Sequence, residues 1–121
     1  MAIITREKLI ELMDKKIVGK DFVLIDVRRP EELKNGIIPN SINIPLDILE
    51  ESLKKYISDD SFFNKNFNIP EGKNTAVIFY CRSGNRSSIA ESIAESLGLK
   101  AFNYSGSILE WSRYDKNVRA Y

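Results

Sequence analysis

Short apolar runs alternate with amphipathic segments along the chain. The runs Phe22–Ile25 and Ala76–Tyr80 are continuous and rich in β-branched and aromatic residues, which is typical of strands buried on both faces. Ile3-Ile4, Ile42–Ile44 and Lys100–Tyr104 predict three further strands, the first of them at a sheet edge. Because strands alternate with helical segments, the pattern predicts an α/β fold with a largely parallel sheet.

The amphipathic segments predict five helices. We expect Thr5 to cap the first helix, Pro30 to open a short second one and Pro45 to open the third. The fourth follows the second buried strand, and the last begins near Ile108. Their expected apolar faces are Leu9, Ile10, Leu12, Met13 and Ile17 in the first, Leu46, Leu49, Leu53 and Tyr56 in the third, and Ile89, Ala90, Ile93, Ala94 and Leu97 in the fourth, with Gly19, Gly36 and Gly98 at helix ends.

Length and charge limit the class of protein. The 121 residues suit one domain with a sizeable core, and we predict a single domain over residues 1–121 with 115–121 as a tail. A net charge of +1 gives no overall attraction to nucleic acid or to an anionic membrane. The apolar runs are too short to span a bilayer, and the chain starts without a signal-peptide pattern. A single cysteine suits a reducing compartment, so we expect a cytoplasmic protein without nucleic-acid or membrane partners.

The residue types also limit the chemistry. The sequence has no histidine, which removes Cys–His and Ser–His catalytic pairs. With one cysteine, Cys81, the chain cannot form an internal disulfide, and a transition-metal site is disfavoured. We therefore expect no metal, and Cys81 becomes the residue whose surroundings decide the function.

Cys81 stands where the second buried run ends, and Arg82-Ser83-Gly84-Asn85-Arg86-Ser87 follows it. A loop at a helix N-terminus directs several backbone N–H groups to one place, where the helix dipole adds positive charge. Gly84 permits a backbone conformation that lets the loop curl into a cradle. A thiol there has a lowered pKa, so Cys81 is a candidate nucleophile in an anion site. The alternative, a buried structural cysteine, leaves the residues after it unexplained.

Tyr80–Ser87 resembles the active-site loop of the rhodanese-like sulfurtransferases. Residues 24–33 with 36–46, and Gly106–Ile108 with Trp111, resemble the same family in the same order, so the resemblance covers about residues 22–111. The chain departs from the family pattern at three places that leave the loop intact: Ile37 where a histidine is frequent, Asn40-Ser41 where a Gly-Ala pair is frequent, and Gly106-Ser107 where Gly-Gly is frequent.

The resemblance implies a five-stranded sheet with helices on both faces and sulfur transfer through a persulfide on Cys81. A small anionic donor such as thiosulfate would give its outer sulfur to Cys81, and cyanide or a thiol would then remove it. This chemistry requires no metal and no organic cofactor. The cradle N–H groups would come from Ser83, Gly84, Asn85, Arg86 and Ser87, and the hydroxyl of Ser87 would also reach the sulfur.

The charged residues near the loop have alternative roles. Arg82 and Arg86 are candidates for binding the anionic donor and lowering the thiol pKa, but at least one of them is as readily expected to pair with a carboxylate. Asp26 and Arg28 end the first buried strand and are expected to support the loop through a charged hydrogen bond. A structural ion pair is favoured for them over substrate contact, and Trp111 is expected in the core.

Two other functions stay open. A rhodanese-like domain can act as a binding or sulfur-carrier module, and the irregular residues 58–74, with Phe62, Phe63 and Phe67, would then be a partner site, a lid or a packed surface loop. Cysteine phosphatases and arsenate reductases of this fold also hold a thiolate in an N–H cradle. Their loop has five residues between cysteine and arginine, whereas four separate Cys81 from Arg86, which fits a sulfur better than a phosphoryl group.

Overall fold

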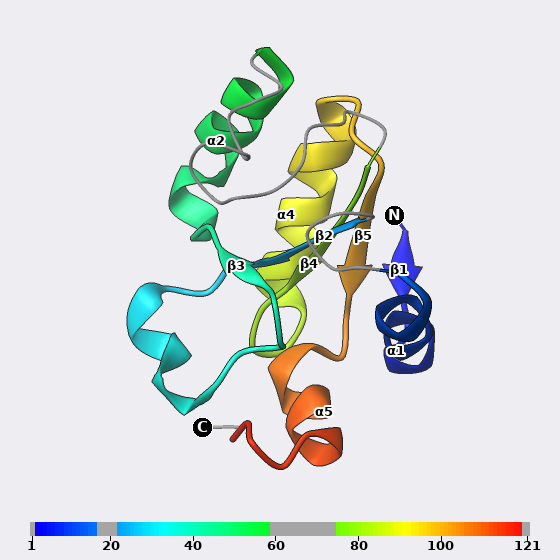
Figure 1. Cartoon of the computed structure of the whole chain (residues 1–121). Coiled ribbons are helices and arrows are strands. Elements are labelled where there is room, and N and C mark those ends of the chain that lie inside the picture. Colours follow the sequence, from blue (N-terminus) through cyan, green and yellow to red (C-terminus); the bar gives the residue numbers. More distant parts are fainter. Residues whose placement is uncertain (1, 17–21, 59–74, 120–121) are drawn as a thin grey trace.

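The computed structural model of the chain describes residues 2–16, 22–58 and 75–119. Within these residues one sheet has five strands in the spatial order β1-β5-β4-β2-β3, and every pairing is parallel (Figure 1). The strands are β1 Ile3–Ile4, β2 Phe22–Asp26, β3 Ile42–Asn43, β4 Ala76–Tyr80 and β5 Ala101–Tyr104. The predicted α/β class is confirmed, and β1 lies at a sheet edge as expected.

The helices cover both faces of this sheet. Their bounds are α1 Arg6–Lys15, the 3₁₀ helix η1 Pro30–Asn35, α2 Leu46–Ser58, α4 Asn85–Ser96 and α5 Ser107–Tyr114. The side chain of Thr5 accepts the Lys8 N–H at 3.2 Å, which confirms the predicted cap of α1. The expectations for Ile17, Gly19 and the three phenylalanines of segment 58–74 lie outside the described residues.

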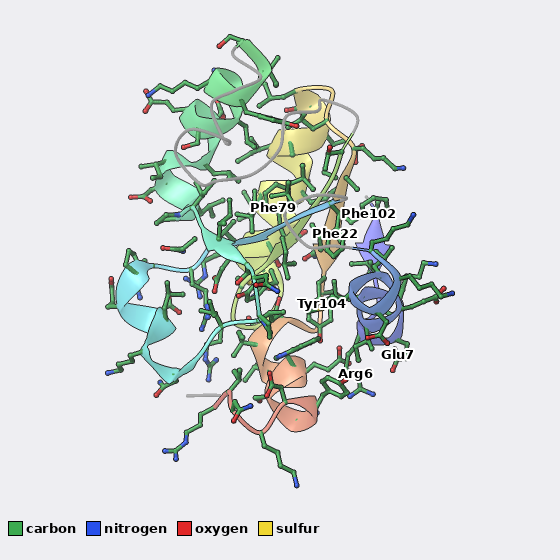
Figure 2. The ribbon with its side chains drawn as sticks, viewed as in Figure 1. Arg6, Glu7, Phe22, Phe79, Phe102 and Tyr104 are labelled. Carbon is green, nitrogen blue, oxygen red and sulfur yellow. The ribbon has the colours of Figure 1, made fainter. Side chains whose placement is uncertain are left out.

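Side chains of β2 and β4 alternate between two apolar layers. Val23, Ile25, Val77 and Phe79 pack with α2 and α4, and the residues between them pack with α1 and α5. Figure 2 shows Phe79 on the side of α4 and Phe102 on the side of α1. The same alternation continues into the residues that directly follow each strand, and it sets the face of the sheet on which they lie.

The buried face of α4 differs from the predicted one. Ile89, expected to face the core, is 53% exposed, whereas Ala90 and Ala94 are fully buried. The helix begins at Asn85, and its buried positions, Ser87 and Glu91 included, are mostly small. Small side chains let the helix axis lie close to the sheet, so the alanine stripe faces inward and Ile89 faces solvent.

Residues 115–119, expected as part of a tail, pack on the domain. Val118 is 5% exposed and belongs to the apolar layer of α1 and α5. The N–H of Arg119 donates to the carbonyl of Asn35 at 3.0 Å, and Val118 lies against Gly36. This part of the chain therefore holds the end of η1 in place.

The different burial of Leu53 and Ile89 predicts different losses of stability when each is truncated to alanine. Leu53 in α2 has no exposed surface, so Leu53→Ala should lower the free energy of unfolding by about 2–5 kcal/mol, measured by urea denaturation. Ile89→Ala is the matched control and should cost less than about 1 kcal/mol, because Ile89 is half exposed. Equal losses for the two variants would contradict the observed orientation of α4.

Candidate active site

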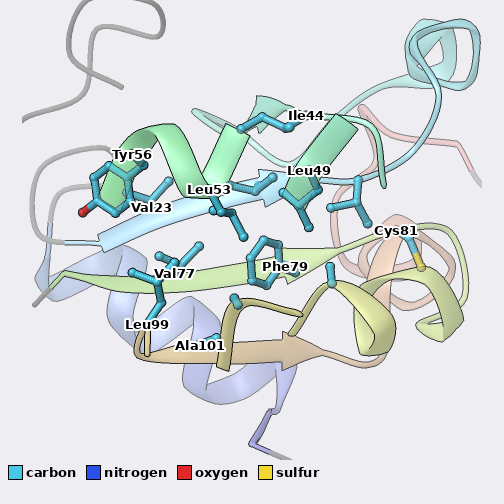
Figure 3. Close-up of a cluster of buried hydrophobic side chains, with 14 residues drawn as sticks. Val23, Ile44, Leu49, Leu53, Tyr56, Val77, Phe79, Cys81, Leu99 and Ala101 are labelled. Carbon is cyan, nitrogen blue, oxygen red and sulfur yellow. The ribbon is translucent and has the colours of Figure 1, made fainter. Parts of the chain in front are cut away.

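The alternation of β4 places Cys81 on the face covered by α2 and α4. Val77, Phe79 and Cys81 point to the same side, and the cysteine is 1% exposed. Figure 3 shows its sulfur at one end of the apolar cluster, beside the loop that leads into α4. This is the carboxyl edge of the sheet, where open parallel sheets bind ligands.

Polar groups converge on the sulfur of Cys81. The N–H of Gly84 donates to Sγ at 3.1 Å, the hydroxyl of Ser87 lies 3.4 Å from Sγ, and that of Ser107 lies 4.0 Å away. Burial is the largest single influence and raises the pKa of Cys81. Hydrogen bonds from the Ser87 hydroxyl and from the backbone of Ser87, Gly84 and Ser83 outweigh it, so the pKa lies below its ordinary value.

Gly84 shapes this cradle. Its φ is 100°, a left-handed conformation that side chains other than glycine rarely adopt. A Cβ atom at this position would also overlap the backbone carbonyl oxygen of Ser105. The close approach of the two backbones lets the Gly84 N–H point at the sulfur, while Ser83 and Asn85 on either side are exposed.

Arg86 forms a two-pronged ion pair with Glu32 of η1. Its Nη1 donates to Oε1 and its Nη2 donates to Oε2 at 2.9 Å. Of the two roles that the sequence left open for the arginines, the structure gives Arg86 the pairing with a carboxylate. Arg82 is partly exposed, and its carbonyl accepts the Leu109 N–H at 3.0 Å.

Asp26 and Arg28 lie on the opposite face of the sheet from Cys81. Both are buried, and Nη2 of Arg28 donates to Oδ2 of Asp26 at 2.7 Å. Arg28 also donates to the carbonyls of Glu32 and Gly36 at 3.2 and 3.0 Å. The pair thus holds the segment that carries Glu32, and it bears on the cradle through the contact of Glu32 with Arg86.

Two contributors to the site were missed by the sequence interpretation. Glu32 lies 54 residues before Arg86, and Ser107 lies 26 residues after Cys81. Glu32 falls in a segment that carries the family resemblance, and Ser107 stands at one of the departures from it. Neither observation indicates which distant residue Glu32 or Ser107 contacts in the fold, so no sequence signal could have assigned these contacts.

A hollow of about 490 Å³ lies beside the cradle. It is lined by Val27, Arg29, Leu46, Asp47 and Arg86, which come from the segment between β2 and η1 and from the starts of α2 and α4. Charges of both signs, from Arg29 and Asp47, stand at its wall.

In the described part of the chain, no three carboxylate or thiol side chains are grouped so that they could hold a metal ion. Nor does any described helix have the length and apolar character needed to cross a membrane.

Comparison with known proteins gives consistent matches. The profile of the rhodanese-like domain matches residues 5–114. A proposed mitochondrial thiosulfate sulfurtransferase of Schizosaccharomyces pombe is 44% identical over 108 residues, which cover 88% of this chain and 74% of that protein. The thiosulfate:glutathione sulfurtransferase of Homo sapiens is 35% identical over 91 residues, covering 73% and 76%. The solved structure of the human single-domain sulfurtransferase TSTD1 superposes with a TM-score of 0.78 at 29% identity, covering 95% of this chain and 98% of that one.

The hydroxyl of Ser87 should lower the pKa of Cys81. In Ser87→Ala the pKa should rise by about one unit, because a hydrogen bond that favours the thiolate is lost. The pH profile of Cys81 alkylation by iodoacetamide measures this shift. Ser96→Ala, which removes an exposed hydroxyl bonded to Ile93 in the same helix, is the control and should leave the profile unchanged. An unaltered profile in Ser87→Ala would refute the assigned contact.

Gly84 and Gly98 give a second, paired test. Both have positive φ, but a Cβ at Gly98 meets no atom within 4 Å, whereas one at Gly84 meets the backbone of Ser105. Gly98→Ala should cost about 1 kcal/mol and leave the alkylation of Cys81 unchanged. Gly84→Ala should cost about 1–3 kcal/mol and slow the alkylation at neutral pH. Thermal unfolding gives the stabilities, and equal thiol reactivity in both variants would speak against the role of Gly84.

Proposed function

The chain belongs to the rhodanese-like domain family, and from that premise we propose that it is a sulfurtransferase that carries sulfur as a persulfide on Cys81. The observation that carries the proposal is the convergence of the Gly84 N–H and the Ser87 hydroxyl on a thiol whose pKa is lowered. A thiolate is the nucleophile that sulfur transfer requires. Relatives named as sulfurtransferases support the same reaction class.

The first half-reaction loads the cysteine. The Cys81 thiolate attacks the outer sulfur of thiosulfate, an S–S bond to Cys81 forms, and the S–S bond within thiosulfate breaks with its electron pair leaving on sulfite. The cysteine ends as a persulfide anion, so charge and atoms balance. Preorganised N–H donors such as that of Gly84 stabilise the anion without reorganisation.

The second half-reaction unloads it. A thiolate or cyanide attacks the terminal sulfur, takes it as a persulfide or thiocyanate, and leaves the Cys81 thiolate. Two separate half-reactions give ping-pong kinetics. Relatives from yeast and human are named for glutathione as acceptor. The hollow lined by Arg29, Asp47 and Arg86 is the candidate place for such a small thiol. Arg29 would have to exchange its contacts with Glu31 and Glu32, at 3.5 and 3.6 Å, to bind a carboxylate there.

Phosphatase chemistry is less well supported. It needs an arginine that turns into the cradle to hold a phosphoryl group, whereas Arg86 is held by Glu32. Four residues between Cys81 and Arg86 also give a small cradle. The partner-protein role of residues 58–74 falls mostly outside the described residues, and Ser58 itself ends α2. That role and the cytoplasmic location remain predictions.

The test is intact-protein mass spectrometry after incubation with thiosulfate in the absence of reductant. The wild-type chain should gain the mass of one sulfur atom and lose it again on addition of cyanide. Cys81→Ser should gain nothing, because it lacks the acceptor thiol. Thiocyanate formation measured in parallel should fall to background in the same variant.

Two negative outcomes have different meanings. No mass gain with rapid alkylation of Cys81 near neutral pH would refute thiosulfate as donor, and protein persulfides and phosphate esters would be tested next. No mass gain with slow alkylation would refute the nucleophilic role of Cys81 and favour a binding module.

A further inference from the structure

Ser107, the first residue of α5, has an unusual backbone. It is fully buried and has a φ of 53°, in the left-handed region that residues other than glycine seldom occupy. Such a conformation costs free energy and persists where other interactions compensate for it. The side chain of Ser107 is therefore the place to look for that compensation.

The hydroxyl of Ser107 contacts the main chain at the ends of β4 and β5 and lies near the sulfur of Cys81. Its oxygen accepts the N–H of Cys81 at 3.1 Å, and its hydrogen is donated to the carbonyl of Tyr104 at 2.8 Å. The same oxygen is 4.0 Å from Sγ of Cys81. A hydroxyl has one hydrogen, so it can donate to Tyr104 or to the sulfur but not fully to both.

The first turn of α5 is fastened to the cysteine loop. The N–H groups of Ile108 and Leu109 donate to the carbonyls of Cys81 and Arg82 at 3.1 and 3.0 Å. Together with the bond from Cys81 N–H to Ser107, these contacts fix the helix start relative to the sulfur. Rotation of the hydroxyl about the Ser107 Cβ–Oγ bond then changes the acceptor of its hydrogen and leaves the oxygen in place to accept the Cys81 N–H.

We propose that Ser107 is a positioning residue whose hydroxyl holds the main chain of Cys81 and turns its hydrogen from the Tyr104 carbonyl to the sulfur when that sulfur is a thiolate. A hydrogen bond to a charged sulfur is stronger than one to a neutral carbonyl, which drives the change. The Gly84 N–H and the Ser87 hydroxyl remain as fixed donors. The inference rests on the proposed role of Cys81 as nucleophile but not on the choice of sulfur donor.

The test compares two variants that lack the hydroxyl but differ in backbone strain. Ser107→Gly suits the positive φ, whereas Ser107→Ala keeps the strain. At pH values below the wild-type pKa of Cys81, both variants should react with iodoacetamide about three- to tenfold more slowly than the wild type. Both should also raise the pKa of Cys81. Ser107→Gly should unfold at a higher temperature than Ser107→Ala.

None of the variants alters a charged group near this region. These groups are Arg82 on the loop, Arg86 on α4 with its partner Glu32, and Glu110 on α5, which accepts the hydroxyl of Tyr104. Ser112→Ala is the matched control, because it removes a hydroxyl of the same helix that bonds to Leu109. It should alkylate as the wild type does.

The outcomes separate the two roles. A raised thiol pKa in both variants supports the proposal, whereas a wild-type pKa in Ser107→Gly overturns it and leaves Ser107 a purely structural residue. Alkylation is measured without a sulfur donor, so a failed sulfur transfer does not affect this result. If neither variant folds, the carbonyl ¹³C resonance of Tyr104 in the wild type decides. It should shift as Cys81 ionises, and a constant resonance overturns the proposal.

Discussion

The site depends on the stabilisation of a buried sulfur by donors that carry no net charge. Sγ of Cys81 is removed from water, which alone disfavours the thiolate. The N–H of Gly84 and the hydroxyl of Ser87 reverse that preference. These donors are effective because the backbone fixes them before any charge develops. The rest of the fold positions the loop, the start of α4 and the start of α5 around this one atom.

The parallel sheet separates the candidate nucleophile, Cys81, from the ion pair that supports the site. Cys81 faces the layer of α2 and α4, whereas Asp26 and Arg28 face the other layer. On the opposite face the pair holds η1, and the carboxylate of Glu32 contacts Arg86.

Patterns local in sequence predicted most of this arrangement. The apolar run before Cys81 and the glycine and serines after it predicted a strand, a cradle and a helix, because each depends on neighbouring residues. The contact of Arg86 with Glu32 and that of Ser107 with Cys81 depend on how distant segments pack, and residue order does not contain that information directly. The exposed Ile89 has the same origin: helical periodicity predicts which residues share a face, but the close approach of α4 to the sheet selects the alanine face.

The pairing of Arg86 with Glu32 also has a consequence for the release of anions from the site. In the proposed sulfur transfer, an arginine that entered the cradle would hold a dianion such as sulfite firmly after the sulfur had been transferred. With its charge matched by a carboxylate that is only 11% exposed, Arg86 adds little net attraction. In the proposed sulfur transfer this pairing would let the sulfite dianion leave more readily than the persulfide, which stays covalently bound to Cys81.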